Sequence, residues 1–370
     1  VAVGSILSGG LDSSSIVAQI SALRSTGTLL PKTFSAVFPN DPTLSEEGEI
    51  RQVVETTGVE SFSIVPDPCD LMSESRSLHW HQEEPFLSAS IYLQWCVSRL
   101  ASKNHVAVML DGQGADELLA GYQYYFRQYQ LDLLDRGNFK DALVETASFS
   151  DRLHAVSQQY KNPERRFDAH VAFSLEELNA MSKSRSSRPG SFPTKYSSGL
   201  PRVSPGNRLR RTLAEALQYN SLPMLLRYAD RNSMAFSREV RMPFLDHRLV
   251  DFILRLPDSL LVREGWQKWI LRRAAPTAVP EVVRWRADKV GYAAPLDRWL
   301  RVEMKEWAAE RLFESTLANL PGYDRRSLER IWTEHMRGQL NHSWTIWRWI
   351  SLAEWRSLTQ SGAWKAGIER

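Results

Sequence analysis

The sequence predicts an α/β protein with a doubly wound parallel sheet of the kind that binds nucleotides, followed by a large helical portion. Three observations lead to this prediction. Strand-like and helical stretches alternate through the first third of the chain, glycine loops follow two of the strand-like stretches, and the pattern after Tyr122 is helical to the end. Because the carboxyl ends of parallel strands share one edge, we expect the glycine loops to lie together there.

The first half supplies the elements of this sheet. Apolar runs predict strands over 1–7, 33–38, 62–65 and 106–110. Between them we expect a helix after the first glycine loop, one capped by Ser45 and ended by Gly58, and a long one over 88–103. The chain is therefore divided into a nucleotide-binding half, 1–128, and a mainly helical half, 129–370.

Two stretches of the second half stand out by composition. Residues 182–206 are rich in Ser, Pro, Gly and Arg and are expected to form a flexible loop. Trp344, Trp347 and Trp355 fall on one face of a C-terminal helix. That spacing favours helix packing over the stacking of nucleobases.

Composition excludes several classes of protein. Hydrophobic residues make up 43% of the 370 residues and charged residues 24%, as in ordinary globular proteins. A formal charge of +3 is too small to indicate nucleic-acid binding. Cys69 and Cys96 form neither a disulfide framework nor a metal ligand set, and no apolar run has membrane-spanning length. We expect a cytoplasmic protein that binds neither nucleic acid nor membrane.

The first glycine loop, Ser8-Gly9-Gly10-Leu11-Asp12-Ser13-Ser14, follows a strand and opens a helix. Its glycines let backbone N–H groups approach an anion, and the helix N-terminus favours the same anion. It is not a Walker loop, because no lysine follows the last glycine. The string SGGLDSS instead resembles the PP-loop of ATP pyrophosphatases. The expected ATP and pyrophosphate contacts are made by Leu7, Ser8, Gly9, Gly10, Asp12, Ser13, Ser14, Ala36 and Gly112.

The second glycine loop, Asp111-Gly112-Gln113-Gly114-Ala115-Asp116-Glu117, follows the fourth strand. Gly112 allows close approach of the backbone to a nucleotide. Asp12 and Asp116 come from different strand ends and can bracket one Mg²⁺ whose coordination the phosphates complete. The expected cofactors are ATP and Mg²⁺, with Asp12 and Asp116 as the metal ligands.

Together the two loops resemble the synthetase domain of glutamine-dependent asparagine synthetases. Three further stretches agree: residues 81–86, HQEEPF, are similar to a D-E-P-F segment, residues 230–246 to a helix-and-turn signature, and residues 286–292, RADKVGY, to an R-x-x-K-x-G-F segment. The resemblance covers nearly the whole chain.

The resemblance implies an ATP-dependent, AMP-forming carbon–nitrogen ligase of asparagine biosynthesis. A carboxylate, first of all the aspartate side chain, is adenylated with release of pyrophosphate, and ammonia then forms the amide. In this scheme Lys289 steadies phosphate charge, and Asp116 and Gln113 complete the catalytic set. Asp230, Arg231 and Ser233 are expected to line the carboxylate pocket.

One loop departs from the family pattern. Asparagine-forming members have Ser-Gly-Glu-Gly where this chain has Asp111-Gly112-Gln113-Gly114. Their glutamate is a candidate base, and an amide cannot accept a proton. Either Asp111 or Glu117 takes the proton, or the product is another amide, such as a β-lactam, a macrolactam or a sugar-acid amide. A nucleotide-binding regulator without catalysis is the remaining alternative.

The resemblance also concerns the source of ammonia. The family carries an N-terminal glutaminase domain whose terminal residue is a cysteine, whereas residue one here is Val1. We therefore expect that domain to lie upstream of this chain in a longer protein. The expected partners are a small carboxylate and ammonia, and a homodimer is left open.

Overall fold

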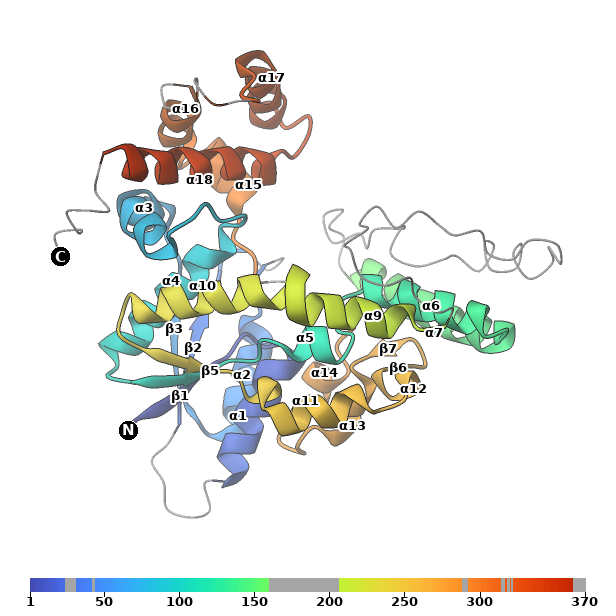
Figure 1. The fold of residues 1–370 in the computed structure, drawn as a ribbon. Coiled ribbons are helices and arrows are strands. Elements are labelled where there is room, and N and C mark those ends of the chain that lie inside the picture. The colour runs from blue at the N-terminus through green and yellow to red at the C-terminus, as the bar shows by residue number, and fades with distance from the viewer. Residues whose placement is uncertain are drawn as a thin grey trace, which may run out of the picture.

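The computed structural model describes residues 1–23, 31–41, 44–159, 206–287, 292–313, 317, 320 and 322–361. Its centre is a five-stranded sheet with the order β3-β2-β1-β4-β5 (Figure 1). Every neighbouring pair in this sheet is parallel. The strands are β1 (Val3–Ile6), β2 (Lys32–Ala36), β3 (Glu60–Ile64), β4 (Val108–Leu110) and β5 (Glu239–Arg241).

The predicted α/β class is confirmed, and so is the alternation of the first third. Helices α1 (Leu11–Leu23), α2 (Glu47–Thr57), α3 (Pro68–Gln82) and α4 (Ser90–Lys103) connect the first four strands. Gly58 ends α2 in the left-handed conformation, at φ 64°. The N-cap of α2 is Glu46 instead of Ser45, although the Ser45 hydroxyl accepts a hydrogen bond from the backbone N–H of Glu47 at 3.4 Å.

The fifth strand was not predicted. The helical reading of the second half is wrong at Glu239–Arg241, which pairs with Val108–Leu110 of β4. This strand has three residues and lies at the edge of the sheet, and its first and last side chains are exposed. It therefore lacks the buried apolar run by which the other strands were recognised. The second half of the chain completes the sheet begun by the first.

Helices lie on several sides of the sheet (Figure 1). The helices α6, α7 and α9 extend to one side, α15 to α18 gather with α3 on another, and α10 runs past the sheet between them. The remaining elements are α5 (Ala115–Leu118), α6 (Tyr124–Asp135), α7 (Phe139–Gln159), α9 (Arg208–Glu215), η3 (Ala216–Asn220), α10 (Leu222–Met234), η4 (Pro243–Leu245), α11 (His247–Leu254), α12 (Asp258–Leu261), the antiparallel pair β6 (Val262–Arg263) and β7 (Trp266–Gln267), α13 (Trp269–Ala274), α14 (Glu281–Arg284), α15 (Leu296–Arg301), α16 (Lys305–Phe313), α17 (Arg325–Met336) and α18 (Ser343–Gln360).

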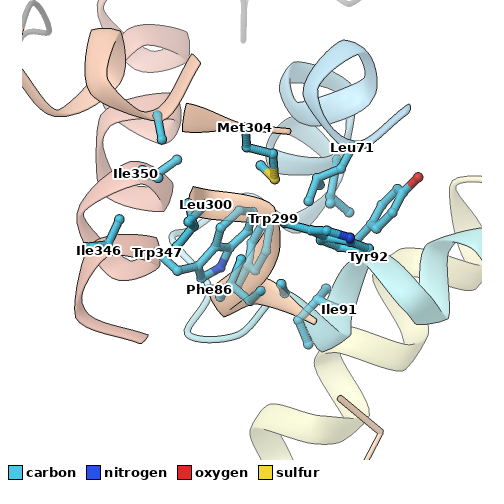
Figure 2. Close-up of a cluster of buried hydrophobic side chains, with 14 of the residues drawn as sticks. Leu71, Phe86, Ile91, Tyr92, Trp299, Leu300, Met304, Ile346, Trp347 and Ile350 are labelled. Carbon is cyan, nitrogen blue, oxygen red and sulfur yellow. The ribbon is translucent and has the colours of Figure 1, made fainter. Parts of the chain in front are cut away.

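An aromatic cluster joins the C-terminal helices to α3 and α4 (Figure 2). Trp299 and Trp347 are its largest side chains and are 1% and 0% exposed. The prediction of helix packing is confirmed for Trp347, which lies inside the cluster. It is wrong for Trp344, which is 56% exposed.

The two cysteines are both free thiols, Cys96 buried in α4 and Cys69 exposed. No helix in the described part of the chain is both long enough and apolar enough to cross a membrane. Of the predicted loop 182–206, all but Gly206 lies outside the described residues.

Candidate active site

The first glycine loop forms a tight turn between β1 and α1. Gly9 has a φ of +80°, and a Cβ at this position would lie 3.1 Å from the Cβ atoms of both Glu46 and Glu49. The Ser13 hydroxyl accepts a hydrogen bond from the backbone N–H of Ser8 at 3.2 Å and lies 3.0 Å from the Ser8 hydroxyl. Positive φ and close packing together require glycine at position 9. The hydrogen bonds between Ser8 and Ser13 stabilise the turn.

The second glycine loop lies directly against the first. Strand β4 pairs with β1, so their carboxyl ends emerge side by side. A Cβ on Gly112 would lie 3.0 Å from Cβ of Asp12 and 3.1 Å from the backbone nitrogen of Ser13. Gly114 turns at φ +90° above Leu245, whose side chain leaves no room for a Cβ. Contact between the two loops therefore depends on glycine at position 112, and the packing of the second loop on Leu245 depends on glycine at position 114.

A buried lysine joins the two loops. Lys268 Nζ lies 2.5 Å from Oδ2 of Asp12 and 2.7 Å from Oδ1 of Asp116. The three side chains are 7%, 16% and 13% exposed, in that order. Burial acts to lower the pKa of Lys268, but the carboxylates of Asp116 and Asp12 outweigh it and raise this pKa above its usual value. The ammonium group therefore stays charged between two carboxylates.

Lys268 reaches this position from a distant part of the chain. It follows β7 in the left-handed conformation, at φ 54°, and its backbone N–H donates to the carbonyl of Leu119 at 3.2 Å. A Cβ at Gly121 would collide with both the Asp116 carboxylate and the Lys268 stem. Sequence reasoning missed Lys268. A lysine between Trp266-Gln267 and Trp269-Ile270 is the signal that could have found it.

The donors at this point suit a metal ion that arrives with a phosphate ligand. Oδ1 of Asp12 is buried and has no hydrogen-bond partner among the described residues. No cluster of three or more His, Cys, Asp or Glu side chains in the described ranges could hold a metal by itself. Mg²⁺ in nucleotide sites commonly takes one or two carboxylates and completes its shell with phosphate oxygens and water. Asp12 and Asp116 fit that pattern.

Asp111 lies at the end of β4 and is partly buried. Desolvation raises its pKa to about 6, although the backbone N–H groups of Gly112 and Gln113 and the Gln113 side chain donate to it and oppose the rise. Oε1 of Gln113 is buried without a hydrogen-bond partner in the described part of the chain. A carboxyl group with such a pKa can accept or donate a proton near neutral pH.

Glu117, the other carboxylate of this loop, has a different environment. It is 1% exposed, and its Oε1 accepts hydrogen bonds from the hydroxyls of Tyr122 at 2.9 Å and Ser221 at 2.8 Å. These contacts tie the loop to η3 and α10. The geometry gives Glu117 a structural role, whereas Asp111 remains partly accessible.

The segment around the predicted catalytic lysine is joined by ion pairs to the start of α2, which packs against Gly9 of the first loop. Arg286 lies 2.6 Å from Oε1 of Glu46 and 3.7 Å from Oε1 of Glu49, the two residues that flank Gly9. The side chains of Arg286 and Glu46 are 10% and 11% exposed. Lys289 itself lies outside the described residues.

The three residues predicted to line the carboxylate pocket, Asp230, Arg231 and Ser233, lie on α10. Arg231 pairs with Glu83 at 2.8 Å and with Asp230 at 3.6 Å. Ser233 is 1% exposed, and its hydroxyl donates to the carbonyl of Asp230 at 3.0 Å. The pair of Arg231 with Glu83 joins α10 to the end of α3, the other two interactions lie within α10, and none of the three reaches the two glycine loops.

The other predicted nucleotide contacts lie within the first loop or beside it. Leu7 is buried, and its carbonyl accepts a hydrogen bond from the Ser35 hydroxyl at 2.6 Å. Ala36 ends the neighbouring strand β2. The backbone N–H of Gly10 donates to the Ser8 hydroxyl at 3.4 Å, while the Ser14 hydroxyl is buried with no hydrogen-bond partner among the described residues. The strand ends therefore gather these residues at one edge.

Comparison with curated proteins yields relatives that match almost the whole chain. Asparagine synthetase (glutamine-hydrolyzing) 1 of Bacillus subtilis strain 168 is 29% identical over 97% of this chain and 56% of its own length. A putative asparagine synthetase (glutamine-hydrolyzing) of Mycobacterium tuberculosis strain H37Rv is 29% identical over 97% of this chain and 55% of its own length. A protein of Penicillium rubens named Amidase chyE is 24% identical over 98% of this chain and 60% of its own length.

The chain thus spans a little over half the length of the first two relatives. The family model described as Asparagine synthase matches residues 1–357. That match includes both glycine loops, Lys268 and the anchored Arg286, and on this ground the chain belongs to the asparagine synthase family.

Proposed function

We propose that this chain is the synthetase part of an ATP-dependent, AMP-forming amide ligase. The observation that carries the proposal is the meeting of two strand-end loops at one cation position, shared by Asp12 and Asp116. A triphosphate laid along the first loop would contact backbone N–H groups and serine hydroxyls, and the second loop would reach it from β4. Family membership supports the same reaction class.

The proposed reaction has two steps. A carboxylate oxygen of the substrate attacks the α-phosphorus of ATP, and pyrophosphate leaves. Ammonia then attacks the acyl carbon of the acyl-adenylate, loses a proton, and displaces AMP to give the amide. Mg²⁺ held by Asp12 and Asp116 would neutralise phosphate charge. Lys289 is proposed to act on the same charge, because Arg286 three residues earlier is anchored beside the first loop.

Asp111 is the proposed acceptor of the proton that ammonia loses. Gln113 cannot serve, because an amide does not accept a proton near neutral pH. Glu117 is 1% exposed, and its Oε1 already accepts hydrogen bonds from Tyr122 and Ser221. Asp111 is partly accessible, and its raised pKa, about 6, suits a base at neutral pH. Gln113 then orients Asp111 by its side-chain hydrogen bond.

The aspartate side chain is the first carboxylate to test, with Asp230, Arg231 and Ser233 as the proposed pocket. A different carboxylate is the second candidate, because the Asp111–Gln113 arrangement departs from the asparagine-forming pattern. The relative named as an amidase supports testing acids other than aspartate. Ammonia is proposed to come from a glutamine-hydrolysing domain outside this chain, as the names of the asparagine synthetase relatives suggest.

The decisive assay supplies ATP, Mg²⁺ and ammonium together with L-aspartate or a panel of other amino and sugar acids. We expect AMP and pyrophosphate in equal amounts, dependent on one of the acids. ADP as the product would exclude the proposal. ATP binding without pyrophosphate release across the whole panel would instead favour a regulatory nucleotide-binding protein.

The role of Asp111 is tested by replacing Asp111 and then Gln113 with the serine and glutamate found at these positions in asparagine-forming members of the family. Asp111→Ser should retain acid-dependent exchange of labelled pyrophosphate into ATP, while ammonia-dependent AMP release falls about a hundredfold. Adding Gln113→Glu to this variant places a carboxylate two positions later and should restore part of the AMP release. Equal losses of exchange and AMP release would show that Asp111 does not act as the base.

A further inference from the structure

A cation already lies where the metal is proposed to bind. Lys268 Nζ is within 2.7 Å of an oxygen from each carboxylate, close enough for direct ion pairs with both. A divalent ion bridging Asp12 and Asp116 would compete with this ammonium for the same oxygens. The ammonium group and the metal therefore exclude one another from this position, or the ammonium group has to move.

In the absence of nucleotide, Lys268 reduces the net negative charge of Asp12 and Asp116. Two carboxylates and one ammonium leave one net negative charge, whereas the carboxylates alone would leave two. Arg272 adds to this effect, since it is 9% exposed and acts electrostatically on Asp12. Two carboxylates whose charge is so nearly neutralised attract a free divalent ion weakly, because the ion must overcome the repulsion of a cation a few ångströms away.

A nucleotide changes this balance. Its phosphates bring several negative charges to the first loop, and Lys268 can then pair with phosphate oxygens in place of a carboxylate. The long lysine side chain permits such a movement without a change in the backbone, which is fixed by the hydrogen bond to Leu119. The carboxylates are then free for the metal that accompanies the phosphates.

We propose that Lys268 occupies the cation position between Asp12 and Asp116 while nucleotide is absent, so that divalent metal enters only together with nucleotide phosphates. This inference rests on the proposed function, which makes these two acids the metal ligands. It gives a function in controlling metal binding to Lys268, a residue that lies outside both glycine loops. It also gives the binding of metal and nucleotide a positive coupling that can be measured without turnover.

The test measures Mn²⁺ binding by electron paramagnetic resonance, with and without α,β-methylene-ATP. In the wild-type chain we expect weak binding of Mn²⁺ alone and binding at least about tenfold tighter with the nucleotide analogue. In Lys268→Met, Mn²⁺ alone should bind about tenfold more tightly than in the wild type, because the competing charge is gone. The analogue should then tighten Mn²⁺ binding less than it does in the wild type.

Two variants serve as controls. Lys32→Met removes a lysine that lies over the Phe62 ring in another part of the sheet, and it should leave Mn²⁺ binding unchanged. Lys268→Met combined with Asp116→Asn removes one carboxylate as well, and the added Mn²⁺ affinity should disappear. If Lys268→Met is folded by circular dichroism and binds Mn²⁺ alone no better than the wild type, the inference is wrong.

A measurement on the wild-type chain avoids any question of variant folding. Crystals soaked in MnCl₂ should show no anomalous peak between Asp12 and Asp116, and crystals grown with Mn²⁺ and the analogue should show one with Lys268 moved away. A peak in nucleotide-free crystals with Lys268 still between the carboxylates would overturn the inference. Failure of the analogue to bind would count against the proposed function, while the Mn²⁺-only comparison would still test Lys268.

Discussion

The sheet edge that carries the glycine loops and the aromatic cluster beside α18 are built in opposite ways. At the sheet edge, charged groups are withdrawn from water: the pKa of Asp111 is raised to about 6 and that of Arg272 is lowered to about 10, both chiefly by desolvation. In the aromatic cluster the buried groups are aliphatic side chains and aromatic rings, and Trp347, Phe86 and Tyr92 are each 0% exposed (Figure 2).

Several polar groups bordering the aromatic cluster have local partners, although Nε1 of Trp347 is buried with no hydrogen-bond partner among the described residues. The Tyr92 hydroxyl donates to the carbonyl of Asp67, and the Ser351 hydroxyl accepts from the backbone N–H of Phe86. At the sheet edge, the buried atoms with no hydrogen-bond partner within the described ranges include a carboxylate oxygen, Oδ1 of Asp12, as well as the Ser14 hydroxyl. Unsatisfied buried polar groups destabilise a fold. A carboxylate oxygen left without a partner costs more than a neutral indole N–H, and from this difference we infer that the edge is arranged for a ligand and the cluster for stability.

The largest expected effect is on chemistry at the sheet edge. Asp116→Asn removes a proposed metal ligand and one partner of Lys268 with little change in shape. Pyrophosphate release should fall by about a thousandfold. Asp251→Asn, which alters an exposed ion pair with Arg255 on α11, is the matched control and should stay near wild-type activity. Activity of Asp116→Asn within tenfold of the wild type would show that the sheet edge does not depend on Asp116 as a metal ligand.

The next effect is on the stability of the aromatic cluster. Trp347→Ala should lower the free energy of unfolding by about 3–5 kcal/mol, because it leaves a large cavity. Trp344→Ala, one turn earlier in the same helix and 56% exposed, should change it by less than about 0.5 kcal/mol. Chemical denaturation measures both. Similar losses in the two variants would contradict the assignment of this cluster as a stabilising core.

Asp111 gives a smaller effect with a defined pH dependence. Because its folded-state pKa is raised from 3.8 to about 6, the folded protein binds more protons than the unfolded chain between these values. Stability from this group therefore falls as pH rises through that window and stays low above it. The free energy of unfolding of Asp111→Asn, measured relative to that of the wild type, should therefore increase by about 2 kcal/mol from pH 4.5 to pH 7.5.

The measurement is the free energy of unfolding of both proteins at the two pH values, without nucleotide. A stability difference between the variant and the wild type that does not change with pH would show that Asp111 is not desolvated. A gain in stability of Asp111→Asn accompanied by loss of activity would show that the buried carboxyl group at the sheet edge serves activity and reduces stability, unlike the side chains of the aromatic cluster.

The smallest expected effect tests whether the loss of stability at the sheet edge comes only from its buried charged groups or also from the backbone nearby. Gly48 lies in α2, close in sequence to Glu46 and Glu49, but a Cβ there would meet nothing within 4 Å. Gly48→Ala should raise the free energy of unfolding by about 0.5 kcal/mol, since alanine loses less conformational entropy on folding. A loss of stability measured by thermal denaturation would show that this helix start is strained as well.

Local patterns were sufficient for much of the first half. The alternation of strands and helices, the end of α2 at Gly58 and the glycine loop after β1 all follow from residues within a few positions of one another. Strand β5 was missed because three residues with exposed ends carry no periodic signal. Trp344 was wrongly expected to pack because spacing gives the face of a helix but not how far its partner extends.

The sequence alone determined the fold class and the two glycine loops, because φ preferences and apolar periodicity act over short distances along the chain. Tertiary structure decided which charges meet. Lys268 lies 256 positions from Asp12, and Arg286 lies 240 positions from Glu46. An ion pair between such residues depends on how helices and strands pack, and packing is a property of the whole folded chain that no local pattern records.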